Sequence, residues 1–350
     1  MFEPLLINEH HRFHTCAQIR IELLKVCKKY PELAQHVYLG KSRQKRVLDA
    51  FTLGRGPIDI SLIAGAHADE PVGPETLRLL IRKCAELRDA SPELFERFRF
   101  VVIPHINPDS EMANQRWIKE WPNLEAYLLH AARELPGDDI EFGFPDMRPE
   151  NRCVASFLKR QPKLAMHMSL HGMGFSEGAM LLIDQRWIDR TKVMRERFSQ
   201  EAAALGLGLH DHDRAGEKGF RYIGPGFTTT PEGNAMREFF LQQGHPEIAN
   251  LFHDSSMDYV RTLSKEPLCL VTELPLFIVQ GENAGKKMGV PMSYLAFREQ
   301  KAALISQLMR GESIAEVKTK FGLSPMPLKK AIALQLTAIQ LGLETVEHYL

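Results

Sequence analysis

The stretch ISLIAGAHADEPVGPETLRLLIRK, residues 60–83, sets the frame for the rest of the chain. Ile60, Leu62, Ile63 and Ala64 predict a buried strand, and apolar residues recur from Leu77 to Ile81 on the face of an amphipathic helix. His67 and Glu70 stand three positions apart between these two elements. Taken alone, the pair is compatible with a surface turn, but an imidazole and a carboxylate are also two of the three protein ligands of an open catalytic zinc site.

Three further apolar runs predict strands of the same sheet. They cover residues 98–103, 164–170 and 268–272. A helical pattern separates residues 60–64 from the first of these runs, and strand, helix, strand is the unit from which parallel sheets are built. We therefore expect an α/β domain with a mixed, mostly parallel twisted sheet and helices on both faces.

Polar residues follow the predicted strands and suggest a common site. His171 follows the apolar run at residues 164–170, and Glu273 follows the run at residues 268–272. Because ligands bind outside the carboxyl ends of the strands in open α/β sheets, we expect His67, Glu70, His171 and Glu273 to converge. Two histidines and one glutamate leave a coordination position free for water, which predicts one zinc ion per chain with Glu273 as a general base. Singly, His171 is also compatible with a core histidine and Glu273 with an ion-paired carboxylate.

Composition narrows the function classes. The chain has 350 residues, of which 44% are hydrophobic and 25% charged, as in soluble globular proteins. Lys plus Arg and Asp plus Glu both number 44, so the charge footprint of a nucleic-acid partner is missing. The sequence shows neither a signal-peptide pattern nor an apolar run long enough to span a membrane. We therefore expect no membrane partner. Five cysteines without a CxxC pair argue against a disulfide framework, and together these features predict a cytoplasmic protein.

The order of the motifs resembles the zinc metallocarboxypeptidases of the carboxypeptidase A type, the funnelins. The matching motifs are HADE, NPDSEMANQR, SLHGMG and VTELP, within a similarity that runs from about residue 38 to residue 273. The resemblance implies that His67, Glu70 and His171 bind zinc and that Glu273 is the general base. It also implies that Arg116 polarises the scissile carbonyl and stabilises the oxyanion.

One motif departs from the family. Where the family has Asp-x-Asn-Arg-Asn-Phe-Pro, residues 139–145 read DIEFGFP, so Glu141 and Phe142 replace the Asn-Arg pair that grips a substrate carboxylate. Either another cation binds the carboxylate, or the substrate presents a different group, such as an amine suited to Glu141. The candidate cations are Arg148, Arg152, Arg214, Lys218 and Arg221. The candidate substrate contacts are Glu141, Phe142, Arg221 and Tyr222.

The composition changes after residue 280 and suggests a domain boundary. We expect a catalytic domain over residues 1–285, with a helix over residues 15–29 packed on it, and a C-terminal helical appendage over residues 286–350. The appendage reads as three helices that cover the domain or make a homo-oligomer contact. Its last helix is an apolar packing face, which disfavours DNA binding.

The expected function is that of a zinc-dependent metallopeptidase that hydrolyses an amide bond by a metal-activated water. We expect a carboxypeptidase acting on small or cell-wall-derived peptides. One alternative is an N-acyl amino acid deacylase of the aspartoacylase or succinylglutamate desuccinylase type. An alternative of another class is a non-catalytic scaffold or regulator that uses its helical tail.

Overall fold

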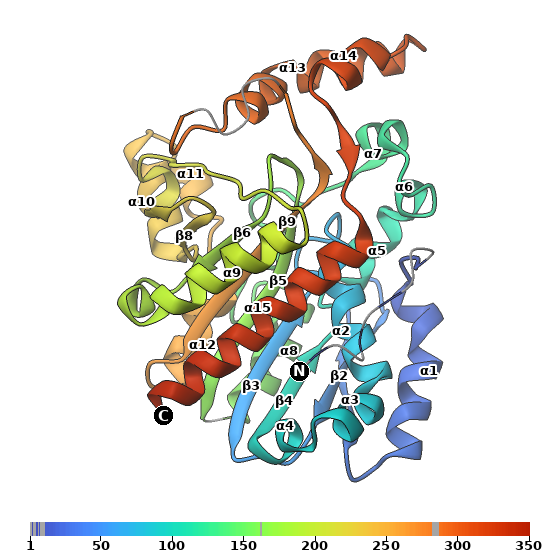
Figure 1. The fold of residues 1–350 in the computed structure, drawn as a ribbon, viewed down its shortest axis with the longest axis vertical. Coiled ribbons are helices and arrows are strands. Elements are labelled where there is room, and N and C mark those ends of the chain that lie inside the picture. Colours follow the sequence, from blue (N-terminus) through green and yellow to red (C-terminus); the bar gives the residue numbers. More distant parts are fainter. Residues whose placement is uncertain (1, 3–4, 6, 8–10, 162, 282–286) are drawn as a thin grey trace.

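A mixed sheet forms the centre of the molecule (Figure 1). The computed structural model describes residues 2, 5, 7, 11–161, 163–281 and 287–350. The strands are β1 Ala34–Lys41, β2 Val47–Leu53, β3 Ile58–Ala64, β4 Phe98–Ile103, β5 Leu164–Ser176, β6 Met180–Ile183, β7 Tyr222–Gly224, β8 Phe227–Thr229, β9 Leu268–Ile278 and β10 Ser324–Pro325. Their order across the sheet is β1-β2-β4-β3-β5-β9-β6-β8-β7, with β10 paired to β9.

The four central strands are parallel, as predicted. β4, β3, β5 and β9 are parallel neighbours, whereas β1 with β2, β2 with β4, and β6 with β9 pair antiparallel. Helices cover both faces of this central part, so β3 is buried along almost its whole length. The apolar residues Ile60, Leu62, Ile63 and Ala64 suit this burial on both faces, and the polar Asp59 and Ser61 are buried among them.

Helices connect and cover the strands. They are α1 Cys16–Lys29, α2 Val72–Arg82, α3 Cys84–Ala90, α4 Pro92–Arg97, α5 Pro108–Ala113, α6 Gln115–Ile118, α7 Leu124–His130, α8 Pro149–Lys159, α9 Lys192–Ala204, α10 Gly233–Gln242, α11 Pro246–Ala249, α12 Ser256–Leu263, α13 Met292–Met309, α14 Ala315–Lys320 and α15 Leu328–Tyr349, with short 3₁₀ helices at Gln185–Trp187, Asp189–Thr191 and Glu217–Gly219. The predicted N-terminal helix is α1, which starts at a capping box between Thr15 and Gln18. Within the described part of the chain, no helix has the length and apolar character needed to cross a membrane.

Two hydrophobic cores lie on opposite faces of the sheet. Leu62 of β3 belongs to the larger core, which it shares with α1, α2, α9 and α15. Ile63, the next residue, belongs to the core that contains Val154 of α8 and Val260 of α12. Successive side chains of a strand point to opposite faces, so a single apolar strand stabilises both layers.

The C-terminal residues complete the larger core. The three helices predicted after residue 286 are present as α13, α14 and α15, and α15 crosses the sheet face beside α2 and α9 (Figure 1). Its buried Gln335 accepts a hydrogen bond from Thr76 Oγ1 of α2 (2.6 Å) and donates one to Thr272 Oγ1 of β9 (3.2 Å). The apolar face of α15 therefore packs within the main domain, which explains its composition without an oligomer contact.

The sheet places the predicted site residues slightly differently from expectation. β3 ends at Ala64, which pairs with Leu170, whereas β5 continues to Ser176 and β9 to Ile278. His171 and Glu273 are thus register partners within two long strands, just beyond the end of β3. The prediction that each ends its own strand was wrong, but the expected convergence follows because β3 stops short beside them.

Candidate active site and metal centre

Three buried side chains converge beyond the end of β3. His67 and Glu70 come from the loop between β3 and α2, and His171 comes from β5. One ligand atom from each lies within 4.8 Å of the others. His171 Nδ1 is 3.0 Å from His67 Nδ1 and 2.9 Å from Glu70 Oε2, and His67 Nδ1 is 3.2 Å from Glu70 Oε1. The predicted metal ligands are therefore brought together.

Two further carboxylates orient the imidazole rings. His67 Nε2 lies 3.1 Å from Asp139 Oδ1, and His171 Nε2 lies 3.2 Å from Glu141 Oε2. A carboxylate accepts a hydrogen bond from the ring N–H that it faces, so the Nε2 atoms donate and the Nδ1 atoms turn toward Glu70. Carboxylates behind ligating histidines commonly fix the tautomer in this way.

The donor set fits a zinc ion. Two Nδ1 atoms that face each other at 3.0 Å need a cation or a proton between them. In the protein without metal, burial would lower the pKa of His171, but hydrogen bonds to Glu141 and Glu70 raise it to about 9. Burial would likewise raise the pKa of Glu70, yet Arg133 and His67 hold it well below its usual range. Two imidazoles and one ionised carboxylate are the ligands of an open zinc site.

Glu273 lines the cavity beside the three ligands, and one of its oxygens is free among the described residues. It is the register partner of His171 and lines the same cavity. Its Oε2 atom is buried and has no hydrogen-bond partner within the described residues. Burial and then the neighbouring Glu70 carboxylate raise the pKa of Glu273 to about 7. A carboxyl group with a pKa near neutrality can both accept and donate a proton, which is the property that a general base and acid needs.

The arginine at the site is Arg133 rather than Arg116. Arg133 Nη1 donates to Glu70 Oε1 (2.6 Å), and its Nη2 lies 2.6 Å from His67 Nδ1. Arg116 is exposed on α6 and does not line the cavity. The structure does not bring Arg116 to the cavity, because Trp117, its neighbour on this short helix, fills the interior position and Arg116 is left outward. The sequence feature that could have pointed to Arg133 is its position six residues before Asp139, the first residue of the DIEFGFP stretch.

A cavity of about 540 Å³ opens over these residues. Glu141 and Phe142 are in its wall, as predicted, but both oxygens of Glu141 are engaged, one by His171 and the other by Ser256. Arg221 and Tyr222 do not line the cavity: Arg221 is exposed, and the Tyr222 hydroxyl donates to Asp211 (2.7 Å). Tyr222 begins β7, a short strand at the edge of the sheet, and Arg221 immediately precedes it.

Cations enter the cavity from two other segments. Arg214 and Lys218 come from the loop before β7, and Arg298 and Lys301 come from α13. Of the cations considered from the sequence, Arg148 pairs with Glu150, and Arg152 donates to the carbonyl of Asp146, so neither lines the cavity. The helical pattern of α13 did not reveal that it borders the site.

Comparison with known proteins agrees with this geometry. Residues 20–125 match the family described as zinc carboxypeptidase. The chain is 23% identical to Carboxypeptidase D of Rattus norvegicus over 172 residues, which are 46% of this chain but 12% of that protein. It is 29% identical to Carboxypeptidase B of Astacus astacus over 100 residues, 28% of this chain and 33% of that protein. The chain thus spans a third or less of the length of these relatives.

Solved structures show the same fold. Carboxypeptidase A from Helicoverpa armigera superposes with a TM-score of 0.55 at 11% identity, covering 95% of this chain and 73% of that chain. Bovine thrombin-activatable fibrinolysis inhibitor, solved with tick carboxypeptidase inhibitor, gives 0.53 at 13% identity, with 96% and 98% covered. The α/β fold and the resemblance predicted from the motifs are confirmed.

Proposed function

Because the chain resembles the zinc carboxypeptidases in both sequence and fold, we propose that it is a zinc-dependent metallopeptidase that hydrolyses an amide bond. The observation that carries the proposal is the convergence of His67, Glu70 and His171 opposite the unpartnered Glu273. Zinc held by the first three residues supplies a Lewis acid that activates water and polarises a carbonyl.

Glu273 moves the protons in this scheme. Its free, buried Oε2 atom accepts a proton from the attacking water and then delivers it to the leaving nitrogen. The burial that raises its pKa to about 7 suits both steps at neutral pH. A glutamate already committed to an ion pair would be a poorer base, and the structure gives Glu273 no such pair among the described residues.

Arg133 stabilises the negative charge that develops on the substrate oxygen. It is the guanidinium in contact with the ligand group, and 45% of its side chain is exposed, so it can turn toward a substrate in the cavity. Asp139 and Glu141 act behind the site by holding the two imidazoles in the ligating tautomer.

The substrate is proposed to be a small peptide with a free carboxylate, for which a cell-wall-derived peptide is the leading candidate. Phe142 cannot bind a carboxylate, but Arg214 and Lys301 line the cavity and have no ion-pair partner in the part of the chain that is described. Arg214 stacks on Phe220, and Lys301 lies over Phe175. These two cations replace the missing Asn-Arg pair in the proposal.

Location is proposed from the cysteines. All five are free thiols in the structure: Cys16, Cys27, Cys84, Cys153 and Cys269. Free thiols are typical of a reducing compartment, which supports a cytoplasmic protein.

The test is a substrate panel assayed with matched variants. The panel contains short peptides with free and with amidated C-termini, cell-wall peptides, and N-acyl amino acids. We expect release of a C-terminal residue from a free peptide, abolished by Glu273→Gln and unchanged by Glu196→Gln, an exposed position on α9. Turnover confined to N-acyl amino acids would favour the deacylase, and no turnover with zinc bound would favour the scaffold.

A further inference from the structure

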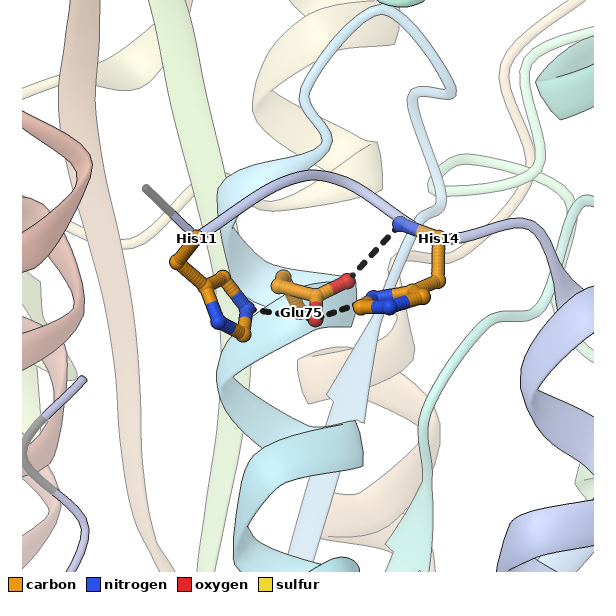
Figure 2. A group of neighbouring side chains, drawn as sticks. All are labelled: His11, His14 and Glu75. Carbon is orange, nitrogen blue, oxygen red and sulfur yellow. Dashed lines mark hydrogen bonds and ion pairs between the residues drawn. The ribbon is translucent and has the colours of Figure 1, made fainter. Parts of the chain in front are cut away.

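A second group of metal-ligating side chains lies apart from the catalytic ligands. Figure 2 shows Glu75, on α2, between the imidazoles of His11 and His14. His11 Nε2 lies 2.7 Å and His14 Nδ1 lies 2.8 Å from the same oxygen, Glu75 Oε1. The three ligand atoms lie within 4.8 Å of one another. A polar segment with adjacent histidines is more often exposed to solvent, so sequence position alone does not predict this group.

Burial distinguishes this group from a surface cluster. The side chain of Glu75 is 1% exposed, and the side chains of His11 and His14 are 13% and 32% exposed. The other oxygen, Oε2, accepts a hydrogen bond from the backbone N–H of His14 (3.1 Å). The carboxylate is therefore fixed with Oε1 turned toward the two rings, and one side of the group still reaches solvent.

Glu75 shares its ion-pair partner, Arg78, with a second carboxylate, Glu111. Arg78 is nearest, with Nη1 at 3.8 Å from Oε2, but its guanidinium is held by Glu111 at 2.6 Å and by the carbonyl of His14. Two buried carboxylates thus share one arginine. A buried carboxylate of this kind needs a cation or a full set of donors.

We propose that His11, His14 and Glu75 form a second binding site, for a divalent transition metal of the zinc type. Two imidazole nitrogens and one carboxylate oxygen are borderline ligands that suit such an ion, and the HxxH spacing lets both rings reach one centre. Water fills the remaining position on the side where His14 is exposed. The ordinary reading, two imidazoles that only donate hydrogen bonds to Glu75, is the outcome that the experiment must exclude.

The site would join two segments that the chain keeps far apart. Residues 11–14 lead directly into α1, whereas Glu75 lies in the first turn of α2, five residues after the catalytic ligand Glu70. A metal here fixes the N-terminal segment against the helix that follows the catalytic loop. It takes no part in hydrolysis, so the proposal does not depend on the proposed function.

The experiment counts zinc in the full-length protein after removal of any affinity tag. Protein stripped with chelator is reloaded with zinc chloride, desalted and measured by elemental analysis, and its melting temperature is recorded at each step. His14→Ala is the informative variant because His14 is partly exposed. His36→Ala is the control, since His36 also pairs with a carboxylate, Asp49, but lies outside any three-residue ligand group.

We expect two zinc ions per chain in the parent protein and in His36→Ala, and one in His14→Ala. His171→Ala should also retain one zinc ion, and the double variant His14→Ala/His171→Ala should retain none. The two single variants therefore distinguish a loss of zinc binding at the catalytic site from a loss at the second site. Zinc should raise the melting temperature of His171→Ala but not that of the double variant. Loss of all zinc from His171→Ala, or the same zinc content in His14→Ala as in the parent, would overturn the proposal.

Discussion

Gly73 sets the distance between the catalytic loop and β5, and its replacement should disturb both stability and metal binding. A Cβ atom on Gly73 would lie 2.4 Å from the carbonyl oxygen of Leu170 and 2.8 Å from its Cβ. Cβ atoms essentially never lie within 3.0 Å of such atoms, and one of the two is backbone, so α2 and β5 must move apart. Glu70 precedes α2 and His171 follows Leu170, so the same movement separates two proposed metal ligands.

The cost of Gly73→Ala follows from this clash. Overpacking a tight contact typically costs about 1–3 kcal/mol, and we expect that loss in the free energy of unfolding. If half of it falls on the ligand geometry, zinc affinity drops by roughly two- to twelvefold, since about 1.4 kcal/mol is a factor of ten. Urea denaturation followed by tryptophan fluorescence measures the first quantity, and competition with a zinc-binding dye measures the second.

Gly224→Ala provides the matched control. A Cβ atom at Gly224 meets nothing within 4 Å, and its φ angle is not positive, so the substitution should change neither quantity. If Gly73→Ala unfolds at the same urea concentration as Gly224→Ala and binds zinc as tightly, the close approach of α2 to β5 does not position the ligands as described.

Three other predictions concern the cavity and the core. Arg133→Ala should lower kcat by about 10²–10³ on a substrate found with the panel, which is the usual cost of removing an oxyanion donor. Arg116→Ala should change kcat by no more than about twofold, and the reverse result would restore Arg116 as the site arginine. Lys301→Ala should raise KM for peptides with a free carboxylate but not for amidated peptides. Lys192→Ala, at an exposed position on α9, should leave KM for both kinds of peptide unchanged. An equal effect of Lys301→Ala on both kinds of peptide would exclude Lys301 from carboxylate binding. Burial lowers the pKa of His167 to about 4, whereas the pKa of this histidine in the unfolded chain is about 6.5. As the pH drops from 6.5 to 4, the unfolded chain binds the proton first, so the free energy of unfolding should fall by about 3 kcal/mol. Urea unfolding at both pH values should show a smaller fall in His167→Gln, and an equal fall would exclude His167 as the cause.

The parts of the fold that repeat a simple pattern were predictable. Segments rich in apolar residues located the four central strands because both faces of a parallel sheet are covered. The carboxyl ends of parallel strands share one edge, so His67, Glu70, His171 and Glu273 could be grouped before any coordinates were known.

The irregular segments were not predictable in the same way. Between β4 and α8 the chain forms short helices of four to seven residues, in which the direction of each side chain depends on which neighbour is buried. Trp117 decides that direction for Arg116, and no periodicity in the sequence records it. The docking of α13 against the cavity is likewise a tertiary contact, so Lys301 could not be assigned to the site from its helix pattern.

The most direct test of the account is to measure zinc and hydrolysis together in His171→Ala and Glu273→Gln. The account predicts that His171→Ala contains one zinc ion fewer per chain than the parent and has no activity. It predicts that Glu273→Gln keeps the full zinc content and is equally inactive. Loss of zinc in Glu273→Gln, or full zinc content in His171→Ala, would contradict the assignment of three ligands and one free base.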